Sequence, residues 1–551
     1  MEDQDLSAPL VEQQPQLILT VHDDDDQPPF SNQAPQTQDY QLGHPHFENL
    51  DGPFEFLGSS SGFDVPVSTT LDPFRNHTLE IEGVYEWVKI VICLPIALLR
   101  LVLFAICMMI GFVATKLALF GWKDKDNPMP NWRCRLMWVT RLVTRGILFS
   151  FGYHWIKRKG KPAPREIAPI IVSNHVSYID PIFYFYEFFP TIVASDSHDS
   201  MPFVGTIIRA MQVIYVNRFT PSSRKHAISE IKRKAGCNRY PRVLLFPEGT
   251  TTNGRSLISF QLGAFIPGYA IQPVVVRYPH VHFDQSWGNI SLAKLMFRMM
   301  TQFHNFMEIE FLPVVPPLEN QKENAVRFAE KTAHAMCRAL NVVQTSHAFG
   351  DVMLLAKALE SKKENPSLYM VEMASVESLY HISSFEAVQF LEIFLSMNPD
   401  NSGHIGIDDF LRVMRLKHCC MSEKIFRFLD AKNTGRLTFK QFLVGSSHIL
   451  KLPLFRRACE VAFTICDANV NRYITQQELR DAILLAIPDI NEDETQEVFK
   501  LFDKDNDGKI SKDDFMTCLR RNPLLISLFS CQLSQIDLTS EITDKSIEEM
   551  V

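Results

Sequence analysis

The order of apolar and polar positions divides the chain into four regions. Residues 1–80 are rich in Gln, Pro, Asp and Ser and include the acidic run Asp23–Asp26. Such a segment buries too little apolar surface to offset the entropy of ordering, so it predicts a disordered tail. Residues 84–122 are strongly apolar, residues 123–345 alternate short apolar runs with longer amphipathic ones, and residues 381–522 carry a repeat.

The apolar region 84–122 predicts a membrane anchor. Ile90–Thr115 contains 26 residues, of which Arg100 is the single charged one. As a straight helix this run would extend about 39 Å, longer than the ~30 Å hydrocarbon core of a bilayer. Pro95 and Arg100 interrupt it, so a re-entrant helical hairpin competes with a single membrane span. A buried helix of a globular domain is the third alternative.

Charged residues around the anchor predict its orientation. The residues before it are acidic and those after it are basic, so the positive-inside rule places the C-terminal side in the cytosol. A second apolar stretch, Met137–Trp155, contains two arginines and predicts an amphipathic helix on the membrane surface. The basic residues are Lys123, Lys125, Arg133, Arg135, Arg141, Arg145 and Lys157–Lys159.

Short β-branched runs between residues 165 and 316 predict a buried sheet. Polar positions do not interrupt these runs, which is typical of strands covered on both faces. Their alternation with helical segments predicts the α/β class, a mixed sheet covered by helices, over residues 123–345. Residues 346–380 predict a charged helical linker. The expected strands are Pro169–Ser173, Thr191–Ser195, Val213–Asn217, Val243–Phe246, Pro273–Arg277 and Glu308–Val315.

Four loops rich in Asp and Asn recur within residues 381–522. They begin at Asn398, Asp430, Asp467 and Asp503, at spacings of 32, 37 and 36 residues, and Phe-rich amphipathic helices flank each one. This period is typical of helix–loop–helix units. We therefore expect an all-α array of four hand-like repeats, followed by a C-terminal tail over residues 523–551.

Composition narrows the class of partner. The chain has 551 residues, enough for several folded units, and is 46% hydrophobic with 41 phenylalanines, which favours a lipid or membrane partner. The net charge of −8 argues against nucleic acid. The 11 cysteines include no C-x-x-C pair, which indicates a reduced compartment. The first forty residues contain no pattern typical of a secretory signal.

A candidate catalytic pair follows the first expected strand. His175 is the second residue after Pro169–Ser173, and Asp180 lies five residues later, before Pro181. On one continuous helix their side chains would point about 140° apart. They can meet if His175 lies in a turn and Asp180 is the N-cap of the next helix. Such a pair is suited to removing a proton from a hydroxyl; the alternative is a capping aspartate beside an unrelated histidine.

Three further motifs accompany the Asn174–Pro181 segment, namely Val213–Arg218, Phe246–Thr250 and Ile271–Val274. In order and spacing the four motifs resemble those of glycerophospholipid acyltransferases, over about residues 165–315. With an apolar segment before them and hand-like repeats after them, the whole chain is similar to the EF-hand-bearing lysophosphatidylcholine acyltransferases. The resemblance is greatest to the type-two branch, which also acetylates lyso-platelet-activating factor.

The resemblance implies roles for particular residues. His175 would take the proton from the sn-2 hydroxyl of a lysophospholipid, and Asp180 would hold its ring. Arg218 would hold a phosphate as a bidentate fork, for which an exposed arginine after an edge strand is the alternative. The remaining substrate-binding residues would be Asn174, Glu248, Gly249 and Thr250, whereas Ile271–Val274 is expected to be a core strand.

The resemblance also implies a donor, a location and alternatives. Acyl-CoA or acetyl-CoA would be the co-substrate, and the enzyme would lie in the endoplasmic reticulum membrane, with the Golgi membrane and the lipid droplet surface as further sites. It would act in phospholipid remodelling and platelet-activating factor synthesis. The same motifs also suit a lysophosphatidic acid or glycerol-3-phosphate acyltransferase. A calcium-dependent scaffold with an inactive acyltransferase domain is the remaining reading.

The four repeats differ in their calcium ligands. An EF-hand loop needs oxygen ligands at positions 1, 3, 5, 7, 9 and 12 and a glycine at position 6. The best match supplies Asp503, Asp505, Asp507, the Lys509 carbonyl and Asp514. The next supplies Asp467, Asn469, Asn471, the Tyr473 carbonyl and Glu478, with Arg472 in place of glycine. The loop from Asn398 has two carboxylates, and that from Asp430, with Lys432 and Gln441, predicts a structural repeat; we therefore expect regulatory Ca²⁺ at one or two hands.

Overall fold

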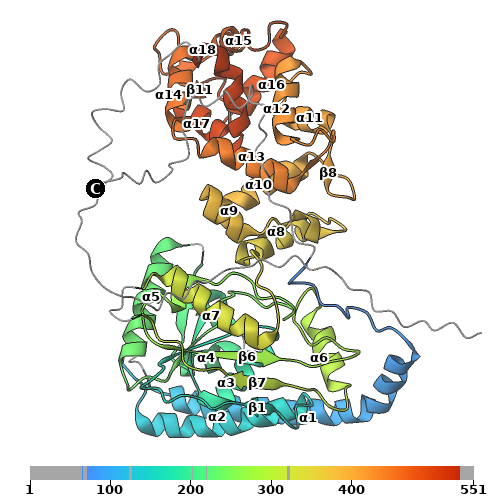
Figure 1. The fold of residues 1–551 in the computed structure, drawn as a ribbon, viewed down its shortest axis with the longest axis vertical. Helices are drawn as coiled ribbons and strands as arrows, with labels where there is room; N and C mark the ends of the chain where they lie inside the picture. Colours follow the sequence, from blue (N-terminus) through green and yellow to red (C-terminus); the bar gives the residue numbers. More distant parts are fainter. Residues whose placement is uncertain are drawn as a thin grey trace, which may run out of the picture. The chain divides into compact units, whose positions relative to one another are not determined.

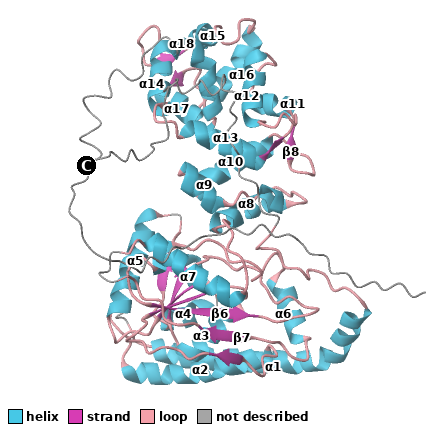
Figure 2. Ribbon diagram, in the orientation of Figure 1, coloured by secondary structure: helices cyan, strands magenta, loops and turns pink. Residues whose placement is uncertain are grey.

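The computed structural model describes residues 65, 71–122, 127–201, 203–218, 220–318 and 323–533 (Figure 1). The expected N-terminal tail up to residue 64, residues 66–70 and the last part of the expected C-terminal tail, 534–551, lie outside this part. Strands and helices alternate up to about residue 345, and the remainder is helical apart from two short ribbons (Figure 2). The predicted α/β domain and all-α array are both present.

A seven-stranded sheet with the order β1-β7-β6-β2-β5-β3-β4 forms the centre of the α/β domain. All neighbouring strands are parallel except β6 and β7. All six expected strands are confirmed; β1 was not predicted because its three residues are charged and exposed. The strands are β1 (Lys157–Lys159), β2 (Ile170–Ser173), β3 (Thr191–Ser195), β4 (Ile214–Val216), β5 (Val243–Leu245), β6 (Ile271–Arg277) and β7 (Glu308–Phe311).

Helices cover both faces of the sheet, as the uninterrupted apolar strands predicted. Alternate residues of one strand enter different cores: Ile171 packs in one apolar cluster, Ile170 and Val172 in the other. The first cluster includes residues of α1 (Val84–Leu119), α2 (Asn131–Ser150), α3 (Ile179–Phe188) and α6 (Leu292–Met300). The second includes residues of α5 (Pro221–Gly236) and α7 (Ala325–Leu340). The short helix α4 (Val204–Ala210) contacts α1.

Helix α1 is continuous through Pro95, so the expected re-entrant hairpin within residues 84–122 is wrong. The chain turns back only after α1, and α2 packs antiparallel to it. Small residues allow this approach: Thr115 Oγ1 lies 3.3 Å from Thr140 Oγ1, and Gly146 lies against Cys107. Figure 1 shows the two helices side by side.

One face of α1 packs against the domain and the other is exposed and apolar. Buried positions recur at helical spacing from Glu86 to Arg100 and again from Cys107 to Ala118. Among them is Arg100, which donates to the Met300 carbonyl at 2.8 Å and to the Phe303 carbonyl at 3.0 Å. The charge that interrupts the apolar run is thereby satisfied inside the protein. Among the described residues, α1 is the one helix long and apolar enough to cross a membrane.

Residues 71–78, which we call the N-terminal strap, correct the expected tail of residues 1–80. Phe74 and Asn76 are buried. The Asn76 amide donates to the carbonyls of Asp284 at 3.0 Å and Ser286 at 2.8 Å, and the Asn253 N–H donates to the Pro73 carbonyl. Composition did not reveal this segment because its partners lie about 200 residues away.

The helical part contains four helix–loop–helix units in two pairs. A short antiparallel ribbon joins each pair: β8 (His404–Ile405) with β9 (Leu437–Thr438), and β10 (Tyr473–Ile474) with β11 (Ile510–Ser511). The helices are α10 (Ser384–Ser396), α11 (Ile407–Met414), α12 (Cys420–Leu429), α13 (Phe439–Leu450), α14 (Phe455–Cys466), α15 (Gln476–Ile483), α16 (Glu492–Phe502) and α17 (Lys512–Arg521).

The boundaries of this array differ from those predicted. The expected linker 346–380 forms α8 (Phe349–Glu360), η4 (Pro366–Tyr369) and α9 (Met373–Tyr380), whose apolar residues enter the core of the array. Residues 523–533, expected as part of a tail, form η5 (Pro523–Phe529) and α18 (Ser530–Leu533) in the same core. We call residues 348–533, which share this core, the hand region.

Candidate active site

The two principal motifs meet where adjacent parallel strands end. β2 pairs with β5, so the residues that follow their carboxyl ends share one edge of the sheet. His175 follows β2 and Glu248 follows β5. The His175 N–H donates to Glu248 Oε1 at 2.9 Å, which joins the two turns directly.

His175 and Asp180 form the predicted contact. Nδ1 of His175 lies 2.9 Å from Oδ2 of Asp180, whose carboxylate is fully buried. The same oxygen accepts the N–H groups of Val176 at 2.7 Å and Ser177 at 2.9 Å. Asp180 is not the N-cap: α3 begins at Ile179, and the Asp180 side chain folds back onto the preceding turn. An ionised carboxylate only accepts, so Nδ1 carries the proton and Nε2 is left as an acceptor.

Tyr278 completes the support of this carboxylate. It follows β6, the neighbour of β2 in the sheet, and its hydroxyl donates to Oδ1 of Asp180. Both carboxylate oxygens therefore have donors. Burial and the nearby Asp180 raise the pKa of Tyr278 well above its usual value, so the hydroxyl keeps its proton. Sequence reasoning missed Tyr278, although a polar residue directly after a strand beside β2 is a usable signal.

Phe246 fixes the orientation of the His175 ring. The two rings stack with centroids 4.1 Å apart and planes inclined by 20°. The His175 side chain is 18% exposed, and Nε2 has no hydrogen-bond partner among the described residues. The imidazole is thus held on one edge and one face, and its second nitrogen is available to accept a proton.

Glu248 lies inside the protein, which favours support of the turn over the predicted contact with substrate. Its side chain is fully buried, and burial raises its pKa to about 8. Oε1 accepts from His175, whereas Oε2 has no hydrogen-bond partner among the described residues. Burial therefore favours the uncharged form of Glu248.

Asn174 is also buried, and both polar atoms of its amide are hydrogen-bonded. Nδ2 donates to the Val276 carbonyl at 2.9 Å, and Oδ1 accepts the Val276 N–H at 2.8 Å. This pairing extends the β2–β6 contact by one residue and fixes the backbone that precedes His175. It favours a supporting role over the expected contact with substrate. Ile271–Val274 is a buried part of β6, as predicted.

Arg218 contacts Gly249, which follows Glu248 in the turn after β5. Gly249 has φ +75°, a left-handed conformation that disfavours a side chain. The Gly249 carbonyl accepts a hydrogen bond from Nη1 of the half-buried Arg218. Burial lowers the pKa of Arg218, which still remains charged near neutral pH. Thr250 is partly exposed in the same turn, so these three residues supply a cation and polar groups near His175.

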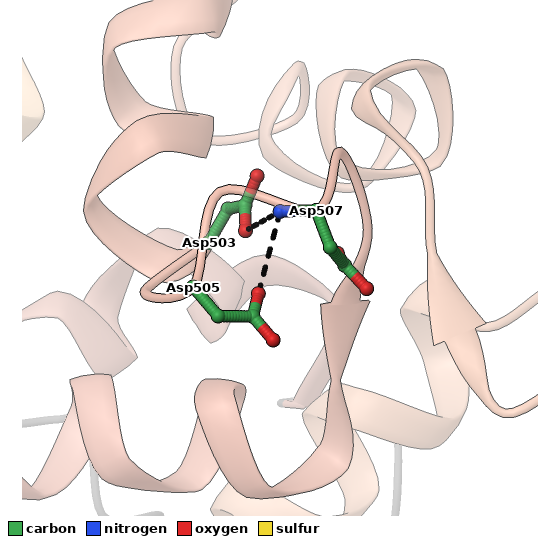
Figure 3. A group of neighbouring side chains, drawn as sticks. All are labelled: Asp503, Asp505 and Asp507. Carbon is green, nitrogen blue, oxygen red and sulfur yellow. Dashed lines mark hydrogen bonds between the residues drawn. The ribbon is translucent and has the colours of Figure 1, made fainter.

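The loop from Asp503 has the arrangement of a calcium site. Ligand atoms of Asp503, Asp505 and Asp507 lie within 4.8 Å of one another. Figure 3 shows the Asp507 N–H donating to the carboxylates of Asp503 at 3.2 Å and Asp505 at 3.4 Å. Gly508, at φ +80°, permits the turn. The Lys509 carbonyl stands at position 7 of the loop and Asp514 at position 12. The Asp514 carboxylate accepts a 2.6 Å hydrogen bond from the Ser511 hydroxyl.

The loop from Asp467 is less suited to calcium. Arg472 occupies the glycine position with φ +70°, which is strained for a side-chain-bearing residue. Asn469 and Glu478, two expected ligands, are bonded to each other at 2.9 Å. Asp467 accepts the N–H of Asn471, and the Tyr473 carbonyl holds position 7. Calcium would have to replace the Asn469–Glu478 bond.

The first two loops are poorer still. In the loop from Asn398, Asp400 accepts three local hydrogen bonds and lies 3.4 Å from Arg436. In the loop from Asp430, the Gln441 side chain accepts the Thr438 N–H at 2.9 Å, and its neutral amide stands at position 12 where a calcium-binding loop has a carboxylate. The loop from Asp430 stays a predicted structural repeat, and Asp400 in the loop from Asn398 is already engaged by local partners.

Comparison with known proteins gives the family. The acyltransferase family profile matches residues 156–277, and that of an EF-hand domain pair matches residues 471–522. Lysophospholipid acyltransferase LPEAT2 of Arabidopsis thaliana is 62% identical over 97% of this chain and 100% of that protein. Lysophosphatidylcholine acyltransferase of Drosophila melanogaster is 32% identical over 81% of this chain and 85% of that protein. The chain belongs to the lysophospholipid acyltransferase family.

Proposed function

We propose that this chain transfers an acyl or acetyl group from acyl-CoA to the sn-2 hydroxyl of a lysophospholipid, with lysophosphatidylcholine and lyso-platelet-activating factor as acceptors. The observation that carries the proposal is the His175–Asp180 pair with Nε2 open. The names of the relatives support a lysophospholipid acceptor. The head group, the donor and the roles in phospholipid remodelling and platelet-activating factor synthesis are part of the proposal.

The chemistry follows from the position of the imidazole. Nε2 of His175 removes the proton of the acceptor hydroxyl, and the oxygen attacks the thioester carbonyl carbon. The C–O ester bond forms as the C–S bond breaks, and the CoA sulfur leaves as a thiolate that takes the proton from the imidazolium. Asp180 stabilises the imidazolium that forms between these steps. Arg218, Gly249 and Thr250 are proposed to hold a phosphate-bearing substrate beside the ring.

The exposed face of α1 supports attachment to a membrane. Its outward residues include Leu99, which is 71% exposed, and Val102. Both ends of α1 are fixed to the same domain, since Lys89 donates to Gln302 and Arg133 donates to the Phe120 carbonyl. We propose that α1 lies in the cytosolic leaflet of the endoplasmic reticulum with its apolar face in lipid. The Golgi membrane and the lipid droplet are further proposed sites.

Vesicle pelleting tests this attachment. Leu99→Glu with Val102→Glu places two charges on the exposed face of α1 and should release the protein from phospholipid vesicles. The matched control, Arg224→Glu with Lys225→Glu on exposed parts of α5, should leave pelleting unchanged. Equal pelleting of the α1 variant and wild type would contradict attachment through this face.

Calcium modulation is proposed for the loop from Asp503. Asp503, Asp505 and Asp507, with the Lys509 carbonyl and Asp514, supply the hard oxygen ligands that Ca²⁺ prefers. The ion would act through the hand region, because His175 and Asp180 lie on a different domain. No step of acyl transfer involves it.

An acceptor-by-donor activity matrix tests the proposed function. Full-length protein in microsomes is assayed with acetyl-CoA and long-chain acyl-CoA against several lysophospholipids, lysophosphatidic acid and glycerol-3-phosphate, with His175→Ala as the blank. We expect activity above the blank with lysophospholipids. Activity confined to lysophosphatidic acid or glycerol-3-phosphate would replace the proposed acceptor. Absence of all transfer would favour an inactive scaffold.

A further inference from the structure

The Phe349 ring lies against the guanidinium of Arg218. Cζ of Arg218 is 4.6 Å from the centre of this ring, which is within cation–π distance. Arg218 also donates to the Gly249 carbonyl, and the β-carbon of Phe349 lies 3.8 Å from where a β-carbon on Gly249 would stand. The guanidinium is thus held between the Glu248–Thr250 turn and one aromatic ring. None of the four motifs contains Phe349.

Phe349 belongs to the hand region rather than to the sheet. It is the first residue of α8, and Leu354 and Ala358 of this helix are fully buried in the core of the hand region. Gly350 shows how closely the start of α8 is packed. A β-carbon there would overlap Ser384, the first residue of α10, and would lie 2.6 Å from Met373 Cγ. The first turn of α8 is therefore in direct contact with the entering helix of the first hand.

Asp351 fixes the start of α8. Its fully buried carboxylate accepts the N–H of Ala348 at 2.9 Å and those of Val371, Glu372 and Met373 at 2.9–3.0 Å. Four donors to one buried carboxylate define its position closely, because each lost bond would leave a buried polar group unpaired. Phe349 lies two residues before Asp351, so the same contacts hold it in place.

The segment before α8 runs along the acyltransferase domain. The Thr345 N–H donates to the Leu257 carbonyl at 2.8 Å, and the Ser259 N–H donates to the His347 carbonyl at 2.9 Å. Residues 257–259 lie shortly after the Glu248–Thr250 turn in the sequence. These bonds hold residues 345–347 against residues 257–259, and Phe349 follows them in the sequence and contacts Arg218.

An aromatic partner suits an arginine that must bind a phosphate. A carboxylate would compete with phosphate for the guanidinium, and no carboxylate among the described residues forms an ion pair with Arg218. A ring occupies only the face of the guanidinium, so the edge N–H groups that Arg218 does not donate to Gly249 stay available. The contact therefore fixes the orientation of the fork without neutralising its charge.

We propose that Phe349 is a positioning residue, which the hand region supplies to orient Arg218 toward the phosphate of a bound substrate. This inference rests on the proposed function. The phosphate belongs either to the lysophospholipid or to the CoA donor, and the two sources are separable because the KM of each substrate can be measured independently. The hand region would then contribute to substrate binding through one side chain.

Steady-state kinetics of full-length Phe349→Leu test the proposal. Leucine fills much of the space but has no ring face, so the KM of one phosphate-bearing substrate should rise roughly five- to thirtyfold, with kcat changed less than about twofold. The substrate whose KM rises identifies the phosphate. Phe349→Tyr keeps the ring and should restore the wild-type KM. Phe385→Leu, on an exposed phenylalanine of α10, is the matched control.

A double-mutant cycle separates positioning from general packing. If Phe349 acts through Arg218, Phe349→Leu combined with Arg218→Lys should raise the KM little more than Arg218→Lys alone. Additive effects, or a wild-type KM for both substrates in Phe349→Leu at an unchanged melting temperature, would overturn the inference while the proposed function stood. A wild-type protein that transfers no acyl group would overturn both.

Discussion

The backbone N–H of His175 donates to the carboxylate of Glu248 at 2.9 Å, although 73 positions separate the two residues in the sequence. This bond joins the turns that follow two different strands, so the two motifs are in direct contact. Glu248 controls the turn that carries the imidazole, while Asp180 controls the ring itself. Three of the expected site residues therefore lie in one hydrogen-bonded unit around His175.

Glu248→Gln should preserve much of the activity that Glu248→Ala loses. The amide oxygen of glutamine can still accept the His175 N–H, whereas alanine leaves that buried donor unpaired at a cost of about 1–3 kcal/mol. We expect kcat to fall at least about tenfold in the alanine variant and much less in the glutamine variant. Equal losses in the two variants would show that the charge of Glu248, rather than its hydrogen bond, is required.

Glu248 should also make stability depend on pH. Burial raises its pKa to about 8 in the folded protein, above the roughly 4.3 of an unfolded glutamate. The folded state therefore binds this proton more tightly, and the resulting stabilisation is present below about pH 4.3 and lost as pH rises through about 8. The free energy of unfolding of wild type relative to Glu248→Gln should fall by about 1 kcal/mol or more between pH 5 and pH 9. Parallel pH profiles in chemical denaturation would contradict this.

Tyr278→Phe should lower kcat without raising KM. The substitution removes the hydroxyl that donates to Oδ1 of Asp180 and leaves one carboxylate oxygen unpaired in the interior. We expect roughly a tenfold loss, because the change weakens the support of the imidazolium. Tyr184→Phe is the matched control, since its hydroxyl donates to Ser173 instead. Similar losses in both variants would point to packing alone.

Removal of residues 1–70 should leave activity and membrane pelleting intact, whereas removal of residues 1–78 should not. The longer deletion takes away the N-terminal strap, whose Asn76 supports the carbonyls of Asp284 and Ser286. The backbone N–H of Trp287, the residue after Ser286, donates to the Val176 carbonyl in the turn that carries His175. Asn76→Ala should lower the melting temperature by several degrees. An unaffected melting temperature in the longer deletion would make the strap dispensable.

Asp503→Asn with Asp505→Asn should abolish one calcium site. The double substitution removes two of the three clustered carboxylates of this loop. Ca²⁺ needs six to eight oxygen ligands, so its binding there should fail. Calorimetry on the solubilised full-length protein should show fewer bound ions than wild type, while basal activity in chelator persists. Asp513→Asn, on an exposed neighbour that is not a ligand, should behave as wild type. A wild type that binds no calcium would make all four hands structural.

The sequence predicted what depends on local pattern. Uninterrupted β-branched runs located the six main strands, and the His175–Asp180 spacing predicted a turn that brings the two side chains together. It misplaced what depends on distant partners. Arg100 suggested a broken anchor, but its charge is satisfied by carbonyls of residues 300–303, which hydropathy cannot show. The tail boundary was wrong for the same reason, because Asn76 finds its partners near residue 285.

The sequence also could not distinguish motif residues that contact substrate from motif residues that support the backbone. Asn174 and Glu248 were expected at the substrate, yet both are buried and bonded to backbone. A motif marks residues that a site needs and does not distinguish contact from support. Tyr278 and Phe349 lie outside the motifs and were missed, because only the fold brings them to Asp180 and Arg218.

Turnover of full-length His175→Ala is the most direct test of the proposed mechanism. It should be measured in membranes with a lysophospholipid and acyl-CoA, together with the melting temperature and vesicle pelleting. Because the proposed base is lost while no buried apolar group changes, we expect a loss of about a hundredfold or more with folding and pelleting unaltered. Retention of more than about a tenth of wild-type turnover would contradict the role of His175 as the general base.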